Sequence, residues 1–483
     1  MSNATDPGFN RAGSIDIVEL KIIGNSGVVA DLKEFLVELN IYEDMFSNTL
    51  YGDILLSDSR NMIDFLPITG EEHINVHFQT PSFEQAGDFV KKSFRVYRLS
   101  NRSIVRDNNT QLYTLHFASR ELFDDMLIPV YTSFEGNVGE LAFDVYNKFL
   151  STSRNLNISN DETDLALETD PSIFVVSETD NNIKFVSPGW SPLKIINWLA
   201  SKAIPKEDTK AKDFLFYETT KAFYFTSVEK IFKSANDDNN IVGVYSYSAA
   251  NLKDDGNSDP NRQLNLVSNI ELVESNDHVK NYTNGYLSNR LITLDVFNKK
   301  YEVIDYDYIQ DYKNYYHSSG KGEAAEPLFN KDNPSIPYSS VSFYPVNPKL
   351  FQTSQTEYFK DNISEKMKDI YGNRKCSLLG LTNIKLNITV PGRTDVEAGR
   401  MLYFQFPKLS PASEEDMEND EKHLDTLYSG RYLITAVHHR ITPTEHLMIM
   451  EIVKDSLSYL PRFDQKVTSG ASGFDINDDL LKR

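Results

Sequence analysis

The chain reads LNIYEDMFSNTLYGDILLSDS from Leu39 to Ser59 and LPITGEEHINVHF from Leu66 to Phe78. Apolar and polar residues alternate through most of both stretches, and Gly70 lies in a segment with the composition of a turn. Alternation with a period of two is typical of strands that bury one face. The pattern therefore predicts a strand, a bend, a second strand, a turn and a third strand.

The same alternation extends on both sides of this segment. It covers residues 15–22, 94–100 and 111–117, and turn residues separate the runs. Several short strands at this spacing indicate an antiparallel barrel or sandwich over residues 15–120. One short helix is expected near residues 59–65, with Ser57 or Asp58 as its cap.

After residue 119 the period changes to that of helices. Amphipathic helices are expected over residues 138–150 and 192–203, the latter with Ser191 as cap and Pro192 at its first position. A third is expected over residues 361–371. Strand patterns return at residues 214–225, 381–406 and 430–454. We therefore expect a second barrel, related to the first and interrupted by a long insertion.

Length and composition limit the class of protein. At 483 residues the chain is long enough for about two to four domains. Its formal net charge is −21, which makes it a poor general binder of nucleic acid, because such binders need clustered Lys and Arg. An acidic surface can serve solubility alone, or it can let DNA slide past without sticking.

Targeting signals and disulfides are not expected. Cys376 is the single cysteine, so no intrachain disulfide can form. The N-terminal residues lack the basic start and apolar run of a signal peptide, and no stretch of 18 apolar residues predicts a membrane span. The sequence indicates a protein that matures in the cytoplasm or is assembled into a particle there.

Histidine and cysteine were considered as ligands or nucleophiles. His73 and His77 have a spacing that would bind zinc on a helix, but their context is a strand and no third ligand stands out. His438 and His439 are adjacent on an expected strand and should point to opposite faces. A buried thiol is the preferred interpretation of Cys376.

Carboxylates are abundant in the first barrel, but no spacing singles out an acid and a base. The chain also lacks the nucleophile-elbow, phosphate-loop and zinc-protease motifs. We therefore predict no catalytic, cofactor-binding or metal-binding residue. The carboxylates considered were Glu43, Asp53, Asp58, Glu71 and Glu72.

Two groups are candidates for a subunit interface. Tyr306, Tyr308 and Tyr312 belong to a tyrosine-rich run, and tyrosine supplies contact area at low entropic cost. Arg95 and Arg98 belong to the one dense basic cluster and would suit contact with an acidic neighbouring ring or subunit. The alternatives are ordinary core packing for the tyrosines and a solvated outer face for the arginines.

Several segments follow one another in the order seen in a known family. They include WSPLKIINWL from Trp190, FLFYETTKAFYF from Phe214, DVFNKKY from Asp295 and SGRYLITAVHH from Ser429. Together with the opening segment, this order resembles the baseplate hub subunit of T-even-like contractile-tailed phages. The resemblance covers roughly residues 15–457, nearly the whole chain.

The resemblance implies a β-rich α+β fold with two tail-tube-like antiparallel β-barrels and helical or mixed insertions. The resemblance also predicts the order of domains and terminal segments along the chain. They are a flexible N-terminus (1–14), a first barrel (15–120), a helical or mixed insertion (121–210), a split second barrel (211–232 and 381–457), an insertion with an irregular arm (233–380) and a polar tail (458–483).

The resemblance also implies a structural role rather than an enzyme. Three copies would form a ring that joins the six-fold tail tube to a three-fold spike and lines the channel through which DNA leaves. The implied partners are a separate spike protein, the tail tube and baseplate wedge proteins, and the location is the tail baseplate of the virion. A receptor- or carbohydrate-binding module and a cell-wall hydrolase on the same scaffold are the alternatives.

Overall fold

The structure is a computed structural model. It describes residues 12–25, 27–81, 89–105, 110–151, 173–206, 209–236, 240–247, 263–295, 299–329, 340–345, 363–406 and 424–458. Within this part, 14 strands form one large mixed sheet, and several sheets of two or three strands surround it. The fold is therefore β-rich α+β, as expected.

The first strands form an antiparallel run in the order β3-β4-β7-β6-β5-β1-β2. Alternation creates it, since every second residue of β4 and β5 is buried. The short helix begins at Met62 with Asn61 in the cap position, so neither Ser57 nor Asp58 is its cap residue, although the carboxylate of Asp58 accepts a hydrogen bond from Met62 N (2.6 Å). The elements are β1 (Asp16–Ile23), β2 (Val29–Asp31), η1 (Lys33–Phe35), β3 (Leu36–Asp44), β4 (Tyr51–Asp58), α1 (Met62–Phe65), β5 (His73–Gln79), β6 (Phe89–Val105) and β7 (Thr110–Ser119).

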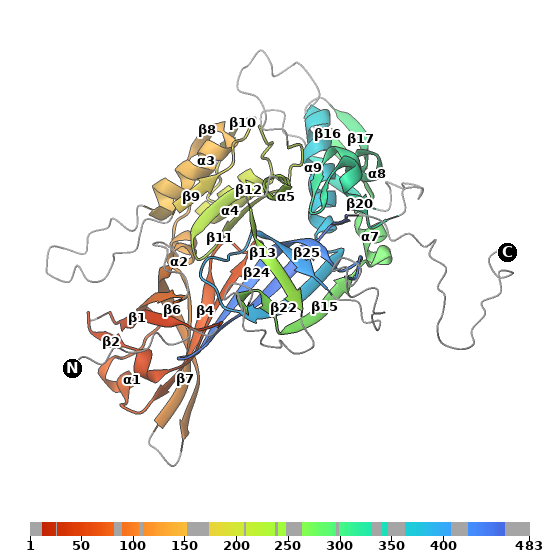
Figure 1. Cartoon of the computed structure of the whole chain (residues 1–483). Coiled ribbons are helices and arrows are strands. Elements are labelled where there is room, and N and C mark those ends of the chain that lie inside the picture. The colour runs from red at the N-terminus through yellow and green to blue at the C-terminus, as the bar shows by residue number, and fades with distance from the viewer. Residues whose placement is uncertain are drawn as a thin grey trace, which may run out of the picture.

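A mixed layer follows, in which helices pack against small sheets (Figure 1). Pro192 stands at the start of α4 as expected, but Ser191 makes no side-chain cap bond, and Asp125 Oδ1 accepts from Leu193 N instead (2.6 Å). The elements are α2 (Arg120–Leu127), β8 (Ser133–Asn137), α3 (Val138–Val145), the π-helical turn η2 (Tyr146–Ser151), β9 (Ile173–Val176), β10 (Asn182–Val186), α4 (Pro192–Ala200), β11 (Phe214–Glu218), β12 (Ala222–Ser227) and α5 (Val228–Asn236).

The next region returns strands to the large sheet and then builds a three-stranded sheet backed by α9. Helix α9 is longer than the helix expected over residues 361–371. The elements are β13 (Ile241–Tyr247), β14 (Leu266–Val267), β15 (Asn269–Ser275), α7 (His278–Asn284), β16 (Ser288–Asp295), β17 (Lys300–Asp307), α8 (Tyr308–Asp311), η4 (Tyr312–Asn314), β18 (Tyr316–His317), β19 (Gly320–Lys321), η5 (Gly322–Ala324), β20 (Glu326–Pro327), β21 (Val341–Pro345) and α9 (Ile363–Gly380).

The C-terminal strands complete the large sheet. Strand β24 is the link between its two parts, because it pairs with β23 through Gly430–Leu433 and with β3 through Ala436–Ile441. A bulge between Ile434 and Ala436 lies where the partner changes. The elements are β22 (Ile384–Pro391), β23 (Met401–Gln405), β24 (Gly430–Ile441), β25 (His446–Lys454) and β26 (Ser456–Leu457).

Two expectations about strand pairing need correction. In the described part of the chain no ladder closes into a barrel: the edge of β3 that closure would need is paired with β24. The hairpin β11–β12 does not join the C-terminal strands but pairs with β9. Its place in the large sheet is taken by β13, β14 and β15, from the segment expected to be an insertion.

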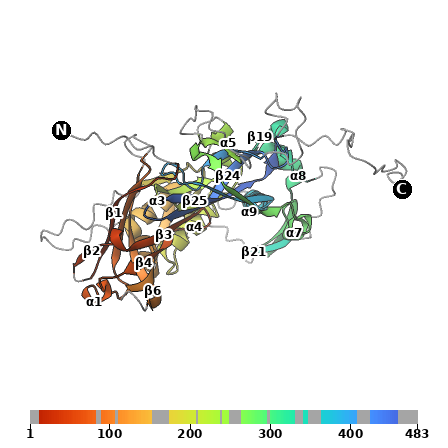
Figure 2. The same cartoon turned by 60° about the horizontal axis from the view of Figure 1, so that its bottom comes forward.

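The large sheet carries two hydrophobic cores on one side. One lies against β1–β7 and includes Leu20, Ile54 and Phe117, and the other lies against β22–β25 and includes Ile388 and Met450. Figures 1 and 2 show β1–β7 at one end of the molecule and α7 with β21 toward the other. None of the helices in the described ranges is long and apolar enough to cross a membrane.

Candidate functional site: a polar face across the large sheet

The side of the large sheet that points away from the cores forms one continuous face. Registers place every second residue of β15, β22, β25, β24, β3 and β4 on this side. We call it the outward face. Its members are Asn269, Glu271, Glu274, Lys385, Asn387, Thr389, Leu447, Ile449, Glu451, Ala436, His438, Arg440, Glu38, Asn40, Tyr42, Asp44, Tyr51, Asp53 and Leu55.

Three aromatic rings stack across the link between the two parts of the sheet. Tyr42 lies between Tyr51 and His438, with ring centroids 5.1 and 4.5 Å away. These residues are directly opposite one another on β4, β3 and β24, so the stack follows from the register. It joins the two parts of the sheet on their solvent side.

Hydrogen bonds between polar side chains lie beside the stacked rings and also cross the strands. Asn40 Nδ2 donates to Glu38 (3.0 Å) and to Asp53 (3.1 Å), and its oxygen lies 2.8 Å from His438 Nε2. The Tyr42 hydroxyl donates to Asp53 at 3.3 Å. Burial, and then the charge of Asp53, raises the pKa of Tyr42 to about 12.

Negative charge dominates the outward face. Its two cations, Lys385 and Arg440, are both paired with carboxylates of the same face: Lys385 lies 3.0 Å from Glu451, and Arg440 lies 2.8 Å from Glu38. Burial lowers the pKa of His438, so its ring adds no positive charge at neutral pH. The remaining carboxylates leave a net excess of negative charge, which repels a polyanion.

A buried polar cluster holds the two parts of the sheet together on the core side. Glu43 of β3 accepts hydrogen bonds from Thr220 N and Ala398 N, each at 2.8 Å. Its Oε1 lies 3.6 Å from Nε2 of His439, whose Nδ1 lies 3.1 Å from Nε2 of His446. We call these residues the junction cluster: Glu43, Thr220, Ala398, His439 and His446.

Burial and neighbouring groups determine the charges of Glu43 and His446 in the junction cluster. Burial alone would raise the pKa of Glu43, but the nearby His439 ring and the hydrogen bonds from Thr220 and Ala398 outweigh it and hold that pKa below its ordinary value. Burial lowers the pKa of His446 well below its usual range, so that ring is neutral. A buried carboxylate that accepts backbone hydrogen bonds from two distant segments is a structural tie rather than a free base.

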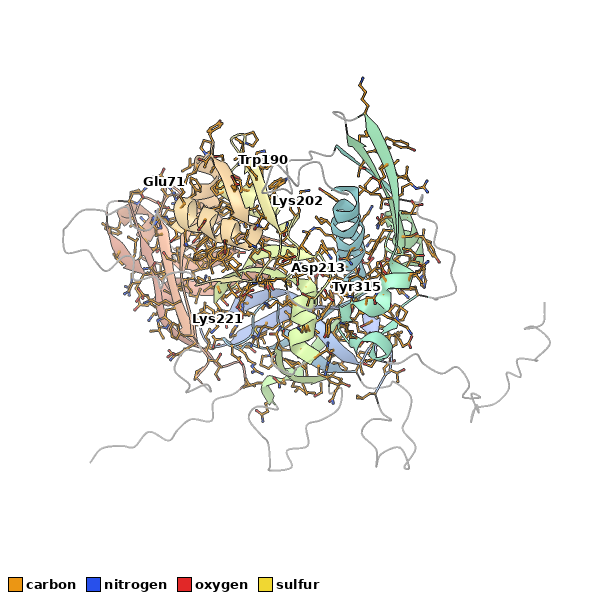
Figure 3. The ribbon with its side chains drawn as sticks, turned by 90° about the horizontal axis from the view of Figure 1, so that it is seen from above. Glu71, Trp190, Lys202, Asp213, Lys221 and Tyr315 are labelled. Carbon is orange, nitrogen blue, oxygen red and sulfur yellow. The ribbon has the colours of Figure 1, made fainter. Side chains whose placement is uncertain are left out.

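The two expected interface groups lie in different environments. Tyr306, Tyr308 and Tyr312 are buried within the chain and pack with Tyr315, which Figure 3 labels. Arg98 is exposed on β6, and the guanidinium of Arg95 lies 5.2 Å from the ring of Phe123. The tyrosines thus pack as core in the single chain, and contact with another subunit stays a prediction for both groups.

The tyrosine cluster surrounds a buried ion pair. His317 Nδ1 lies 2.7 Å from Asp455 Oδ2, and its Nε2 lies 2.9 Å from the carbonyl oxygen of Tyr312. Ser318 and Ser456 are adjacent, which superficially resembles a Ser-His-Asp set. Both ring nitrogens of His317 are occupied and the residue is buried, so it cannot serve as a general base in this arrangement.

The carboxylates considered from the sequence have separate structural contacts. Asp58 accepts a backbone bond from the first residue of α1, and Glu72 accepts backbone bonds from Thr69 and Gly70 (2.5 and 2.9 Å). Glu71 accepts from an asparagine side chain at 3.0 Å. Among the described residues, no group of three or more His, Cys, Asp or Glu side chains is arranged to hold a metal ion.

The cysteine and the adjacent histidines behave as their patterns indicated. Cys376 is buried, Asn289 Nδ2 lies 3.3 Å from its sulfur, and burial raises its pKa. His438 points to the outward face and His439 to the core side, as expected for neighbours on a strand. The junction cluster was missed because its members are far apart in the sequence. The outward face was visible as the polar phase of the alternation.

Comparison with known proteins gives the family likeness. A curated relative, the "Probable baseplate hub protein gp334" of Vibrio phage KVP40, is 20% identical over 443 residues, which covers 88% of this chain and 91% of the relative. The chain resembles the phage baseplate hub proteins. The resemblance inferred from the order of sequence segments is thereby confirmed. No protein-family model matches the chain.

Two tail proteins are among the solved structures found to be similar to this chain. One is a tail protein from Neisseria meningitidis MC58 (TM-score 0.49, 8% identity, covering 90% of this chain and 96% of that one). Another is the 43 kDa tail protein of prophage MuSo2 from Shewanella oneidensis (TM-score 0.49, 10% identity, covering 90% and 98%).

Proposed function

We propose that this chain is a structural baseplate hub protein of a contractile phage tail. The observation that carries the proposal is the similarity to a baseplate hub protein along nearly the full length of both chains. A match of that extent takes in most of both chains. It favours a shared architecture rather than one shared module.

In this proposal three copies form a ring. The two parts of the large sheet, with their separate cores, act as two tail-tube-like units in each chain, so three chains present six units to a six-fold tube. The domain ranges expected from the sequence would apply with β13–β15 added to the second unit and the β11–β12 hairpin moved out of it. The partners are the tail tube above, a separate spike protein below and wedge proteins outside, in the tail baseplate of the virion.

The outward face would line the channel. Its carboxylates outnumber its cations, and both of those cations are paired within the face. A polyanion moving along such a surface finds few sites at which to release counterions and bind. This charge pattern supports a role in which DNA is cargo passing through the ring rather than a ligand.

The proposal is tested by measuring the oligomeric state of the chain and by locating the chain in the particle. Native mass spectrometry of the purified full chain, alone and with its spike protein, is expected to give a trimer. Imaging of the particle is expected to place the chain between the tail tube and the spike. A chain that remains monomeric over a broad concentration range with and without the spike would contradict the ring.

A further inference from the structure

One end of the large sheet presents an open edge. Strand β15 pairs with β22 on one side, and no strand of the described ranges pairs with its other side. Leu272 and Val273 are about half exposed on this strand, and Val279 is 75% exposed on α7, which follows it. An open edge with exposed apolar side chains is a ready site for another chain.

This edge is also acidic. Glu271 is exposed in the middle of β15, where Asn387 Nδ2 lies 3.4 Å from its carboxylate. Glu274 is neutralised by Lys280 at 2.5 Å, so Glu271 supplies the unneutralised charge of the strand. We call Glu271, Leu272, Val273 and Val279 the β15 surface.

The β6 strand carries a surface of opposite character. Arg98 is exposed, Tyr97 is 47% exposed at a bulge of the strand, and Ile104 is 69% exposed farther along. Arg102 is also exposed, and its Nε donates to Gln111 at 2.9 Å rather than to a carboxylate. Arg102 and Ile104 face the other side of the hairpin, because Ile104 is opposite Gln111 whereas Arg98 is opposite His116. We call Tyr97 and Arg98 the β6 surface, which combines positive charge with an aromatic ring.

The two surfaces cannot meet within one chain. Figure 1 shows β15 beside β22, well away from the β6–β7 hairpin in the other part of the sheet. Surfaces of complementary charge at separate places on one molecule produce a head-to-tail contact between copies, which closes into a ring when the rotation allows it. Another copy of this chain carries a β15 surface that complements the β6 surface, so a second copy is the expected partner.

We propose that the β15 surface of one copy docks on the β6 surface of the next. The apolar residues of the β15 surface and the ring of Tyr97 are buried in the contact, and Glu271 lies against Arg98. The inference rests on the proposed ring and names the two surfaces that make it. It also accounts for the exposure of Arg98, which has no comparable role in the single chain.

The test is a charge-reversal cycle on the full-length chain. Glu271→Arg and Arg98→Glu are each expected to raise the concentration needed for half-assembly by roughly tenfold, because a repulsion replaces an attraction at every contact. The double variant, E271R with R98E, restores opposite charges between neighbouring copies and is expected to recover most of the assembly. Sedimentation velocity over a concentration series measures all three.

The control is Glu302→Arg, which reverses an exposed carboxylate on β17, outside both surfaces. It is expected to assemble as the wild type does. Trimers that persist in both single variants, or a double variant no better than the single ones, overturn the docking proposal and leave the ring intact. A loss of assembly in E302R alone moves the contact to the β16–β17–β21 sheet. A monomeric wild type overturns both proposals.

Discussion

The pair of His317 and Asp455 makes the stability of this protein depend on pH. Burial alone would lower the pKa of His317, but Asp455 and the carbonyl of Tyr312 raise it above the ordinary value of 6.5. The same contact with His317 helps hold the pKa of Asp455 below 3.8, against burial. The pair therefore contributes fully between about pH 4 and 6.5, and its contribution is lost as pH rises through the folded pKa of His317.

The replacement His317→Gln tests this linkage. It is expected to lower the free energy of unfolding by ~3 kcal/mol at pH 5.5, because it leaves a buried carboxylate without its charged partner. The difference from the wild type should shrink as pH rises toward 9. Denaturant titrations at several pH values measure it, and a difference that grows with pH would contradict the assignment.

Asp213 gives the free energy of unfolding a different dependence on pH. It is buried, one of its oxygens has no hydrogen-bond partner among the described residues, and burial followed by the charge of Glu229 raises its pKa to about 7. A carboxyl with a raised pKa costs stability as pH rises from its unfolded value of 3.8 to its folded one. Figure 3 labels Asp213 beside the tyrosine cluster.

We therefore expect Asp213→Asn to stabilise the chain at pH 8 by about 1–3 kcal/mol and to have little effect at pH 4. The free energy of unfolding at the two pH values is the measurement. Asp53→Asn on the outward face serves as a control, since Asp53 is only half-buried and accepts bonds from Asn40 and Tyr42. Equal effects of Asp213→Asn at both pH values would rule out the raised pKa.

At the scale of elements, β24 determines the architecture. Its first residues pair with β23, its later residues pair with β3, and β25 lies along its other side. The junction cluster fixes this change of partner, because Glu43 ties β3 to the β11–β12 turn through Thr220 and to the segment before β23 through Ala398. One strand and one carboxylate thus join parts of the chain several hundred residues apart.

Replacing Glu43 by Gln should loosen that junction. The amide cannot accept from both Thr220 N and Ala398 N, so one buried donor loses its partner, at a cost of about 2–3 kcal/mol. Unfolding in urea and limited proteolysis measure the effect. Glu19→Gln removes a partly exposed pair with Lys21 (3.2 Å) and is expected to cost under about 1 kcal/mol. Similar losses in the two variants would argue against a special role for the junction.

At the scale of the whole molecule, the outward face connects structure with the proposed passage of DNA. Adding positive charge to it should create sites that hold the polymer. Asn387→Lys, Thr389→Lys and Leu55→Lys combined add three positive charges to the face, two of them directly opposite Glu451 and Glu38. Particles carrying this variant are expected to assemble normally and to release DNA roughly severalfold more slowly.

The matched control carries Gln at the same three positions, which keeps side chains of similar reach without the charge. Its rate of DNA release, followed by dye fluorescence after triggering, should equal that of the wild type. The slowing in the Lys variant should weaken as salt concentration increases, since the contact is electrostatic. Equal release by the Lys and Gln variants would separate this face from the channel.

Local patterns in the sequence were enough to predict many of the helices and strands and the polar face of part of the large sheet. The alternation of β3, β4 and β5 predicted strands, and its polar phase contained Glu38, Asn40, Tyr42 and Asp53. Pro192 signalled the start of α4. These predictions succeeded because a strand or a helix start depends on residues only a few positions apart.

Only the tertiary structure decided which strands pair and which polar groups are buried together. The pairing of β24 with β3, the place of β13–β15 in the large sheet and the separation of β11–β12 from it all depend on contacts between distant segments. Glu43 looked like one polar surface carboxylate among several although it shares the apolar phase of β3 with Leu39 and Ile41, and Tyr306 looked like surface contact area, yet both are buried. Period-two patterning determines which side of a strand is apolar, but the neighbour that covers it is set by packing of the whole chain.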